Sequence, residues 1–168
     1  MKKPGTAPPS TAGREQQAGR ERRPSASIRR AQDQKIGPDE TEIARIILEN
    51  LSDGLWVANR NDIIVYINGI MAEIAGTKRE RIIGASVING FSEETLGDFR
   101  VSYMKAKESL IPVDYEAQVV TPAGRRTWQA GRIIPIVRDS LFDGMITTVK
   151  DITAAKLSEE NRQALAAI

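Results

Sequence analysis

Carboxylate side chains are the main candidates for catalysis in this chain, because its 168 residues include no cysteine and no histidine. Asp114 and Glu116 stand two apart in an alternating stretch, which predicts the polar face of a strand. Glu93 and Glu94 fall in the predicted first turn of a helix, where the helix dipole favours acidic residues. Neither spacing predicts a paired-carboxylate site, and no phosphate-binding glycine loop of the P-loop type can be read. We therefore expect no enzyme activity here, so that any kinase or cyclase activity would belong to a separate effector domain.

The missing cysteine and histidine also restrict cofactors and metals. Without thiols the chain cannot form disulfides, thiolate metal sites or a cysteinyl-flavin adduct. Without imidazoles it lacks a histidine-ligated haem, histidine metal ligands, a histidine general base and a phospho-accepting histidine. We expect no metal site. The cofactor remains unknown, with the histidine-ligated haem and the cysteinyl-flavin adduct disfavoured.

A candidate ligand site follows from the register of a predicted hairpin around the turn Thr121-Pro122-Ala123-Gly124. If this four-residue loop joins the strands directly, the pairs are Val120 with Arg125, Ala117 with Trp128, Tyr115 with Ala130, and Val113 with Arg132. One apolar face then holds Val113, Tyr115, Ala117, Val119, Trp128, Ala130, Ile134 and Ile136. Arg132 falls on the same face, where a guanidinium needs an anionic or carbonyl partner. It either reaches the edge or a protein carboxylate, or it binds a carboxylate-bearing metabolite.

Aromatic residues give further ligand-binding candidates. Trp56, Tyr66 and Trp128 pack in the core or stack on a ligand, and the sequence leaves both interpretations open. Asn68 follows a strand and is placed to cap the next helix.

The stretch Gly144 to Thr153 reads as a strand that ends on a helix-start signal. Asp151 or Thr153 can cap the exit helix, an interaction typically worth about 1 kcal/mol. A shift of the strand would then alter the helix, so Asp151, Ile152 and Thr153 are candidate signal-relay residues, with purely structural caps as the alternative. The residues that follow, Leu157, Asn161, Ala164 and Ile168, have the spacing of a two-helix seam or of one amphipathic helix packed on its own domain.

The remaining segments position these residues. A helix that starts at Gly37-Pro38-Asp39-Glu40 carries Ile43, Ile46, Ile47 and Leu51 on one face, which forms either a dimer contact or a lid on its own domain. A hairpin of 55–58 and 63–67 follows, and a short helix then ends at Gly76. A capping box at Thr77 predicts a second short helix that runs to Gly84. Ser92 caps a longer helix, which carries Leu96, Phe99, Tyr103 and Ala106 on one face. We predict an α+β fold with a five-stranded antiparallel sheet, short helices on one face, an N-terminal amphipathic helix and a C-terminal exit helix.

The charge is unevenly distributed. Residues 1–35 carry nine Lys/Arg against three Asp/Glu, a net +6, whereas 36–168 carry fifteen against nineteen, a net −4. We predict a disordered basic tail over 1–37, in which contact with nucleic acid is disfavoured because no aromatic residue interleaves the basic clusters. No apolar stretch is long enough to span a bilayer, so a cytoplasmic location is the default expectation.

Several motifs in this order resemble the PAS family of sensory domains over residues 40–153. They are Asp53-Gly54-Leu55-Trp56-Val57, Ile64-Val65-Tyr66-Ile67-Asn68 with a helix to Gly76, Arg81-Ile82-Ile83-Gly84, Pro122 to Trp128, and Lys150-Asp151-Ile152-Thr153. Asn61-Asp62 replaces the usual glycine of the first hairpin turn, and both residues tolerate a left-handed conformation.

The resemblance implies a sensory module over 38–153, followed over 154–168 by the start of a signalling helix. Such a module binds a small ligand or relays a signal, usually as a homodimer, and controls a separate effector. We expect a histidine kinase of the two-component type as that effector. The alternatives are a ligand-free dimerisation scaffold and a transcriptional regulator with a nucleic-acid-binding tail.

Overall fold

The computed structural model describes residues 37–168, of which Asp39–Ile168 form one compact unit. The predicted basic tail lies outside the described residues except for Gly37. The helices are α2 (Glu40–Glu49), α3 (Gly69–Ala75), a 3-10 turn η1 (Arg79–Arg81), α4 (Glu93–Leu96), α5 (Phe99–Ser109) and α6 (Thr153–Ala166). The strands are β1 (Gly54–Asn59), β2 (Ile64–Ile67), β3 (Val113–Val120), β4 (Arg126–Arg138) and β5 (Leu141–Asp151).

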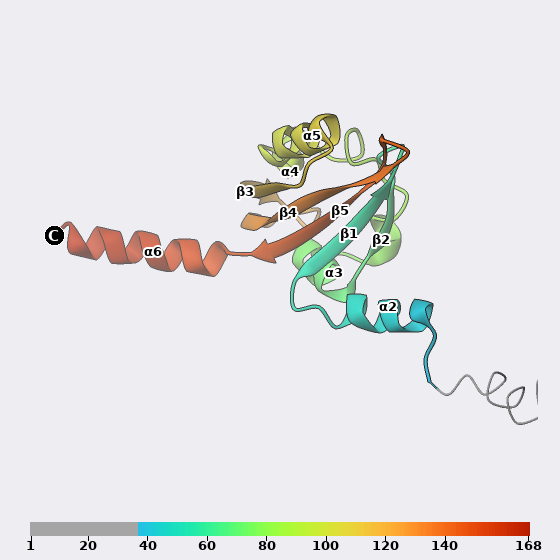
Figure 1. The fold of residues 1–168 in the computed structure, drawn as a ribbon. Coiled ribbons are helices and arrows are strands. Elements are labelled where there is room, and N and C mark those ends of the chain that lie inside the picture. The colour runs from blue at the N-terminus through green and yellow to red at the C-terminus, as the bar shows by residue number, and fades with distance from the viewer. Residues whose placement is uncertain (1–36) are drawn as a thin grey trace, which may run out of the picture. The chain divides into compact units, whose positions relative to one another are not determined.

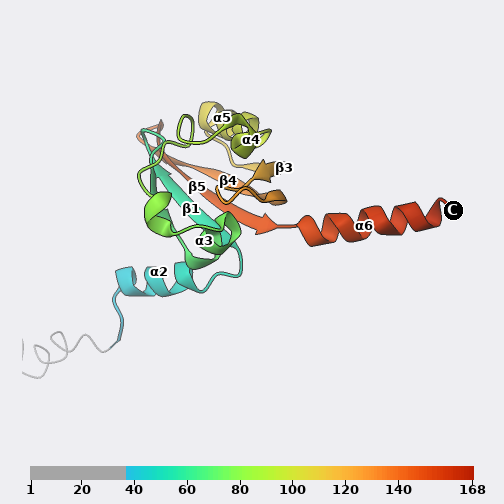
Figure 2. The same cartoon turned by 180° about the vertical axis from the view of Figure 1, so that it is seen from behind.

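The five strands form one antiparallel sheet in the order β2-β1-β5-β4-β3. The helices α3, α4 and α5 lie on one face of this sheet, as the two opposite views show (Figures 1 and 2). The last strand, β5, is central and pairs with both β1 and β4. The predicted α+β fold is therefore confirmed, and the strand that leads into the exit helix touches both halves of the sheet.

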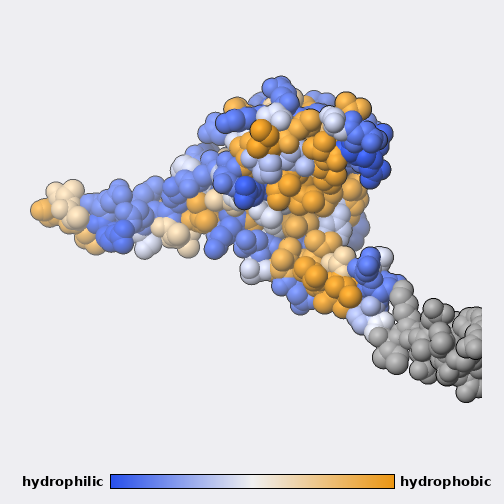
Figure 3. All heavy atoms as spheres, in the orientation of Figure 1, coloured by the Kyte–Doolittle hydropathy of each residue, from blue (hydrophilic) through white to orange (hydrophobic). Residues whose placement is uncertain are grey.

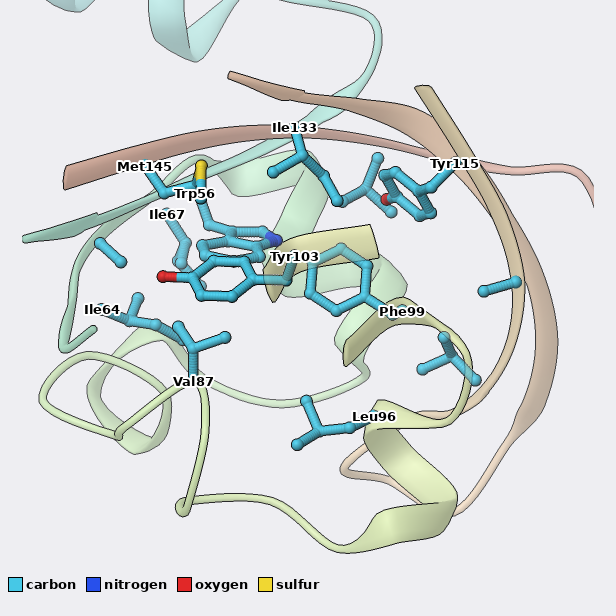
Figure 4. Packing of buried hydrophobic residues seen from close by; sticks show 14 of the residues in the cluster. Trp56, Ile64, Ile67, Val87, Leu96, Phe99, Tyr103, Tyr115, Ile133 and Met145 are labelled. Carbon is cyan, nitrogen blue, oxygen red and sulfur yellow. The ribbon is translucent and has the colours of Figure 1, made fainter. Parts of the chain in front are cut away.

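The core lies between the sheet and these helices (Figure 4). Its aromatic centre is Trp56 on β1, which stacks on Tyr103 of α5 with ring centroids 6.1 Å apart and meets the edge of Phe99 at 5.8 Å. Phe99 in turn meets Tyr115 of β3 at 5.0 Å. These contacts join the first strand, the longest covering helix and the third strand in one packed cluster.

Asn68 is fully buried and satisfies all of its polar groups. Its Oδ1 accepts hydrogen bonds from the N–H of Met71 at 2.9 Å and of Leu55 at 3.0 Å. Its Nδ2 donates to the carbonyls of Leu48 at 3.1 Å and Asp53 at 3.0 Å. The predicted N-cap is confirmed, and the same side chain also fixes the end of α2 and the entry to β1.

The short helices differ from expectation at two places. The capping box at Thr77 does not form, because Lys78 precedes only the three-residue turn η1 and makes no side-chain cap. Ser92 caps a helix as predicted, but Gly97, with φ 46° and ψ −137°, ends it after Leu96 and a second helix starts at Phe99. The predicted shared face survives this break, since Leu96, Phe99, Tyr103 and Ala106 are all buried.

The predicted register of the second hairpin is wrong by one residue. Val120 pairs with Arg126, Ala117 with Gln129, Tyr115 with Gly131, and Val113 with Ile133. The loop holds five residues rather than four, because the N–H of Thr121 donates to the carbonyl of Arg125 at 2.8 Å and Thr121 Oγ1 accepts from the N–H of Arg125 at 3.0 Å. A slip of one residue moves every side chain of β4 to the opposite face. The residues Trp128, Ala130, Arg132, Ile134 and Ile136 therefore lie on the outer face, and Thr127, Gln129 and Ile133 face the core.

Gly131 permits an unusually close approach of β4 and β5. A Cβ at this position would lie 1.9 Å from the carbonyl oxygen of Thr148. Tyr115, paired with Gly131, reaches across it and donates its hydroxyl to that same carbonyl at 3.1 Å. The absence of a side chain at residue 131 thus lets β3 hold β5 directly.

Candidate functional site

A cavity of about 90 Å³ lies between the inner face of the sheet and the helices. Its walls come from all five strands, from α3, α4 and the start of α5, from the segment between η1 and α4, and from the loop after β3. The lining residues are Trp56, Ile64, Ile67, Met71, Ala75, Ile82, Val87, Phe91, Thr95, Leu96, Phe99, Tyr115, Val119, Thr121, Pro122, Gln129 and Val149. None of these residues is charged, so the cavity is apolar with a few neutral polar groups.

Two polar atoms on the cavity residues have no hydrogen-bond partner among residues 37–168. Gln129 donates from Nε2 to Thr127 Oγ1 at 3.1 Å, but its Oε1 receives no hydrogen bond. The indole N–H of Trp56 likewise has no acceptor, and Figure 4 shows it on the side of the ring nearest Tyr115. Trp56 is 7% exposed and Gln129 is 6% exposed. The residues that line the cavity therefore include one donor and one acceptor without a protein partner.

The structure places two of the five predicted ligand-binding residues at the cavity and the other three outside it. Trp56 and Tyr115 line the cavity. Trp128 and Arg132 lie on the outer face of β4, because of the register shift, and Arg132 forms a surface ion pair with Asp114 at 3.5 Å. The placement of Arg132 on the apolar inner face is wrong, and so is the carboxylate-binding pocket inferred from it. Tyr66 also lies outside the cavity and donates its hydroxyl to Glu49 Oε1 at 3.0 Å.

The acidic pairs considered for catalysis sit on the surface. Asp114 pairs with Arg132, and Glu116 pairs with Lys156. Glu93 pairs with Arg100 at 3.0 Å in the first turn of α4. Within residues 37–168 no three acidic side chains gather in a group that could hold a metal ion.

A polar triad of the buried Asp62 and Tyr103 with the half-buried Lys107 was not predicted. Asp62, at the left-handed position of the β1–β2 turn with φ 59°, accepts hydrogen bonds from Tyr103 Oη at 2.7 Å and Lys107 Nζ at 2.5 Å. Burial, together with the hydrogen bond to Asp62, raises the pKa of Tyr103 well above its ordinary value, so the hydroxyl stays a donor. Lys107 also lies 4.9 Å from the ring centroid of Phe142. The triad joins α5 to the first hairpin. Tyr103 of the triad stacks on Trp56, and the Trp56 ring lines the cavity.

The joint between β5 and α6 is bonded to the β3–β4 hairpin. Thr153 Oγ1 accepts a hydrogen bond from the N–H of Trp128 at 2.9 Å and donates to Asp151 Oδ1 at 2.5 Å. The N–H of Ile152 donates to the carbonyl of Trp128, also at 2.9 Å. Asp151 Oδ2 lies 2.5 Å from Arg125 Nη2. The side chain of Asp151 bonds the N–H of Thr153 at 3.0 Å, and no side chain caps the first turn of α6 from Ile152.

These contacts set the ionisation of Asp151. Partial burial acts to raise its pKa, but the hydrogen bonds from Thr153 and Arg125 outweigh burial and lower the pKa below the ordinary value for aspartate. The carboxylate therefore stays charged at neutral pH.

The first turns of α6 dock on the same hairpin. Lys156 forms an ion pair with Glu116 on β3, and its Nζ lies 5.0 Å from the ring centroid of Trp128 on β4. Every residue from Glu160 to Ile168 is exposed. The alternative of a helix packed along its own domain therefore does not describe the second half of α6, and Leu157 is 54% exposed even near the joint.

The isoleucine face of α2 is exposed in the described part of the chain. None of its residues is buried, and Ile43, Ile46 and Ile47 are 44%, 51% and 56% exposed. Its end is held by Glu49, which pairs with Arg79 at 2.6 Å, a hydrogen bond that lowers the pKa of Glu49. Leu51, the fourth residue of the predicted contact face, follows the helix and is half-buried.

The family model of the PAS fold matches residues 44–137, more than half of the chain. The chain belongs to the PAS family. No curated protein matches it significantly in sequence.

Solved structures share the PAS fold at low sequence identity. A PAS domain from Colwellia psychrerythraea superposes with a TM-score of 0.60 at 18% identity, covering 69% of this chain and 99% of that domain. A PAS domain from a two-component sensor histidine kinase gives 0.55 at 12% identity, covering 67% and 96%. An RNA-binding light-oxygen-voltage receptor gives 0.65 at 16% identity, covering 80% of this chain and 40% of the receptor.

The PAS cavity does not fit a large cofactor as its side chains stand. Its volume of about 90 Å³ is well below the roughly 300 Å³ at which pockets for drug-sized ligands begin. A haem or a flavin ring system would need the walls to separate. None of the helices in the described part of the chain is long and apolar enough to cross a bilayer.

Proposed function

We propose that this PAS domain is a sensory and regulatory module that controls a separate effector through α6, with a histidine kinase of the two-component type as the expected effector. The observation that carries the proposal is the position of the loop 121–125. Thr121 and Pro122 line the cavity, and Arg125 in the same loop pairs with Asp151 at the start of the exit segment. A molecule that moves the cavity end of this loop would change the hold on α6.

The strand β5 offers a second connection of the same kind. Val149 lines the cavity and is two residues from Asp151. Thr153 is bonded to the N–H of Trp128, and the neighbouring Gln129 lines the cavity. Asp151, Ile152 and Thr153 are thus proposed relay residues, because each is within a few bonds of the cavity wall and of the helix.

The proposal includes a cytoplasmic homodimer. Its support is the exposed apolar face of α2, formed by Ile43, Ile46 and Ile47. Figure 3 shows hydrophobic surface over α2 and over the neighbouring outer face of the sheet. A second copy would remove this apolar surface from water, and the exposed leucines of α6 would continue the contact.

The relay is tested in a chimera in which residues 38–168 replace the PAS domain of a histidine kinase. We expect the double variant Asp151→Ala with Thr153→Ala to change kinase output several-fold, because the side-chain contacts of these two residues with Arg125 and with the N–H of Trp128 are lost. Asp114→Ala, an exposed acidic residue on β3, is the matched control and should leave the output unchanged. Unchanged output in the double variant would show that the joint is ordinary structure.

A further inference from the structure

The cavity residues define a class of ligand that differs from the carboxylate predicted from the sequence. We propose that the cavity binds a small, uncharged and mainly apolar molecule that carries one neutral polar group such as a hydroxyl. This inference rests on the proposed sensory function and specifies its ligand.

Charge is the first constraint. The seventeen lining residues include no Lys, Arg, Asp or Glu. Arg132, the cation expected to meet an anion, is exposed on the other face of the sheet. Burying an ionised group without a partner costs several kcal/mol or more, so anionic and cationic metabolites are excluded from the cavity as it stands.

Size is the second constraint. An engineered cavity of about 150 Å³ binds benzene, and this cavity has about 90 Å³. It therefore accommodates only a few non-hydrogen atoms without movement of its walls. Met71, whose unbranched side chain adapts its shape readily, and the half-buried Phe91 are the lining residues best able to adjust to a slightly larger molecule.

The free polar atoms are the third constraint. Gln129 Oε1 can accept a hydrogen bond, and Trp56 Nε1 can donate one. Both side chains are more than nine-tenths buried, but neither polar atom is completely shielded, because among the described residues only Arg100 Nε and Thr147 Oγ1 are both fully buried and without a partner. A hydroxyl satisfies either atom, because it both donates and accepts. Ordered water can also satisfy them, so water alone is the competing occupant.

The test compares isobutanol with isobutyrate, which share an isopropyl body and differ in charge. Trp128→Phe leaves Trp56 as the single tryptophan, so fluorescence reports on the cavity wall, and methyl NMR of the lining residues gives a second measurement. We expect saturable shifts at the cavity residues with isobutanol and binding more than about 100-fold weaker with isobutyrate. Equal binding of the two, or no saturable shift with isobutanol, would overturn the assignment.

Variants locate the binding. Gln129→Met should weaken isobutanol binding about three- to ten-fold and leave xenon binding unchanged, because only the alcohol uses the amide. Ala75→Leu should fill the cavity and abolish both, whereas Ala130→Leu makes the same substitution on the outer face and should abolish neither. Retention of both probes by a folded Ala75→Leu protein would place them elsewhere. These measurements involve no effector, so their failure is distinct from failure of the relay.

Discussion

Arg125 and Asp151 form an ion pair with 2.5 Å between Nη2 and Oδ2, although 26 residues separate them in the sequence. The pair joins the loop at the cavity to the last residue of β5. Asp151 also accepts two hydrogen bonds from Thr153, so one carboxylate connects the loop, the strand and the exit helix.

This carboxylate predicts a pH dependence of stability. Because the folded-state pKa of Asp151 is lowered, its stabilisation is present above the unfolded-state pKa of about 3.9 and is lost as the pH falls through the folded-state pKa. We expect Asp151→Asn to reduce the free energy of unfolding by about 1 kcal/mol at neutral pH, with a difference from wild type that shrinks below about pH 4. Urea unfolding across this range measures it. Asp114→Asn, with an 80% exposed side chain, is the control, and a pH-independent deficit in Asp151→Asn would contradict the assignment.

Asn68 predicts a large loss of stability. Asn68→Ala removes four hydrogen bonds, one buried and three part-buried, to backbone groups of three segments. We expect a loss of about 3 kcal/mol, measured by urea unfolding. Asn61→Ala, an exposed asparagine in the first hairpin turn, should change stability by less than about 0.5 kcal/mol. Similar small effects for both variants would mean that water replaces the Asn68 side chain.

Tyr103 predicts a smaller, local effect. Tyr103→Phe keeps the stacked ring and removes the hydroxyl that bonds Asp62. We expect a loss of about 1–2 kcal/mol in the free energy of unfolding and faster hydrogen exchange in α5, with Trp56 still buried by fluorescence. Tyr66→Phe removes a more exposed hydroxyl, bonded to Glu49, and should cost less. A larger cost at Tyr66 would reverse this ranking of the two hydroxyls.

The apolar face of α2 predicts an association that a single charge disrupts. Ile47 is 56% exposed, so Ile47→Glu should leave the thermal stability of the isolated domain nearly unchanged. In sedimentation velocity we expect the wild-type protein to run as a dimer and the variant to run as a monomer at the same concentration. Arg45→Glu places the same charge elsewhere on the helix as a control. A monomeric wild-type protein would refute the proposed homodimer.

The sequence predicted the fold well because each element has a local signal. Alternating residues marked β3, the cap Asn68 and the stop Gly76 bounded α3, and Asp62 takes the left-handed conformation that the first turn required. The break at Gly97 was missed because the apolar spacing continues across it. Periodicity reports which side chains are buried, and here it did so correctly even though two helices share the face.

The ligand site was predicted less well because it depends on a register. The hydrogen bond from the N–H of Arg125 to Thr121 Oγ1 lengthens the loop by one residue, and this reverses the faces of Trp128, Gln129 and Arg132. Gly131 carried a usable signal, since a glycine inside a strand often marks a close approach of another backbone. The triad of Asp62, Tyr103 and Lys107 had none, because its members lie on segments that only the tertiary fold brings together.

The bond between Thr153 and Trp128 has a consequence for whatever follows α6. The exit helix begins at Thr153, whose side chain is bonded to β4, so the sheet fixes the direction in which each side chain of α6 points. Each residue inserted after the joint turns the outward-facing side chains by about 100°. Under the proposed relay, a partner that contacts the face of Leu157 would be coupled to the cavity only at particular linker lengths. Inserting a single residue between the joint and Leu157 would reorient that face and leave the contacts of the joint in place.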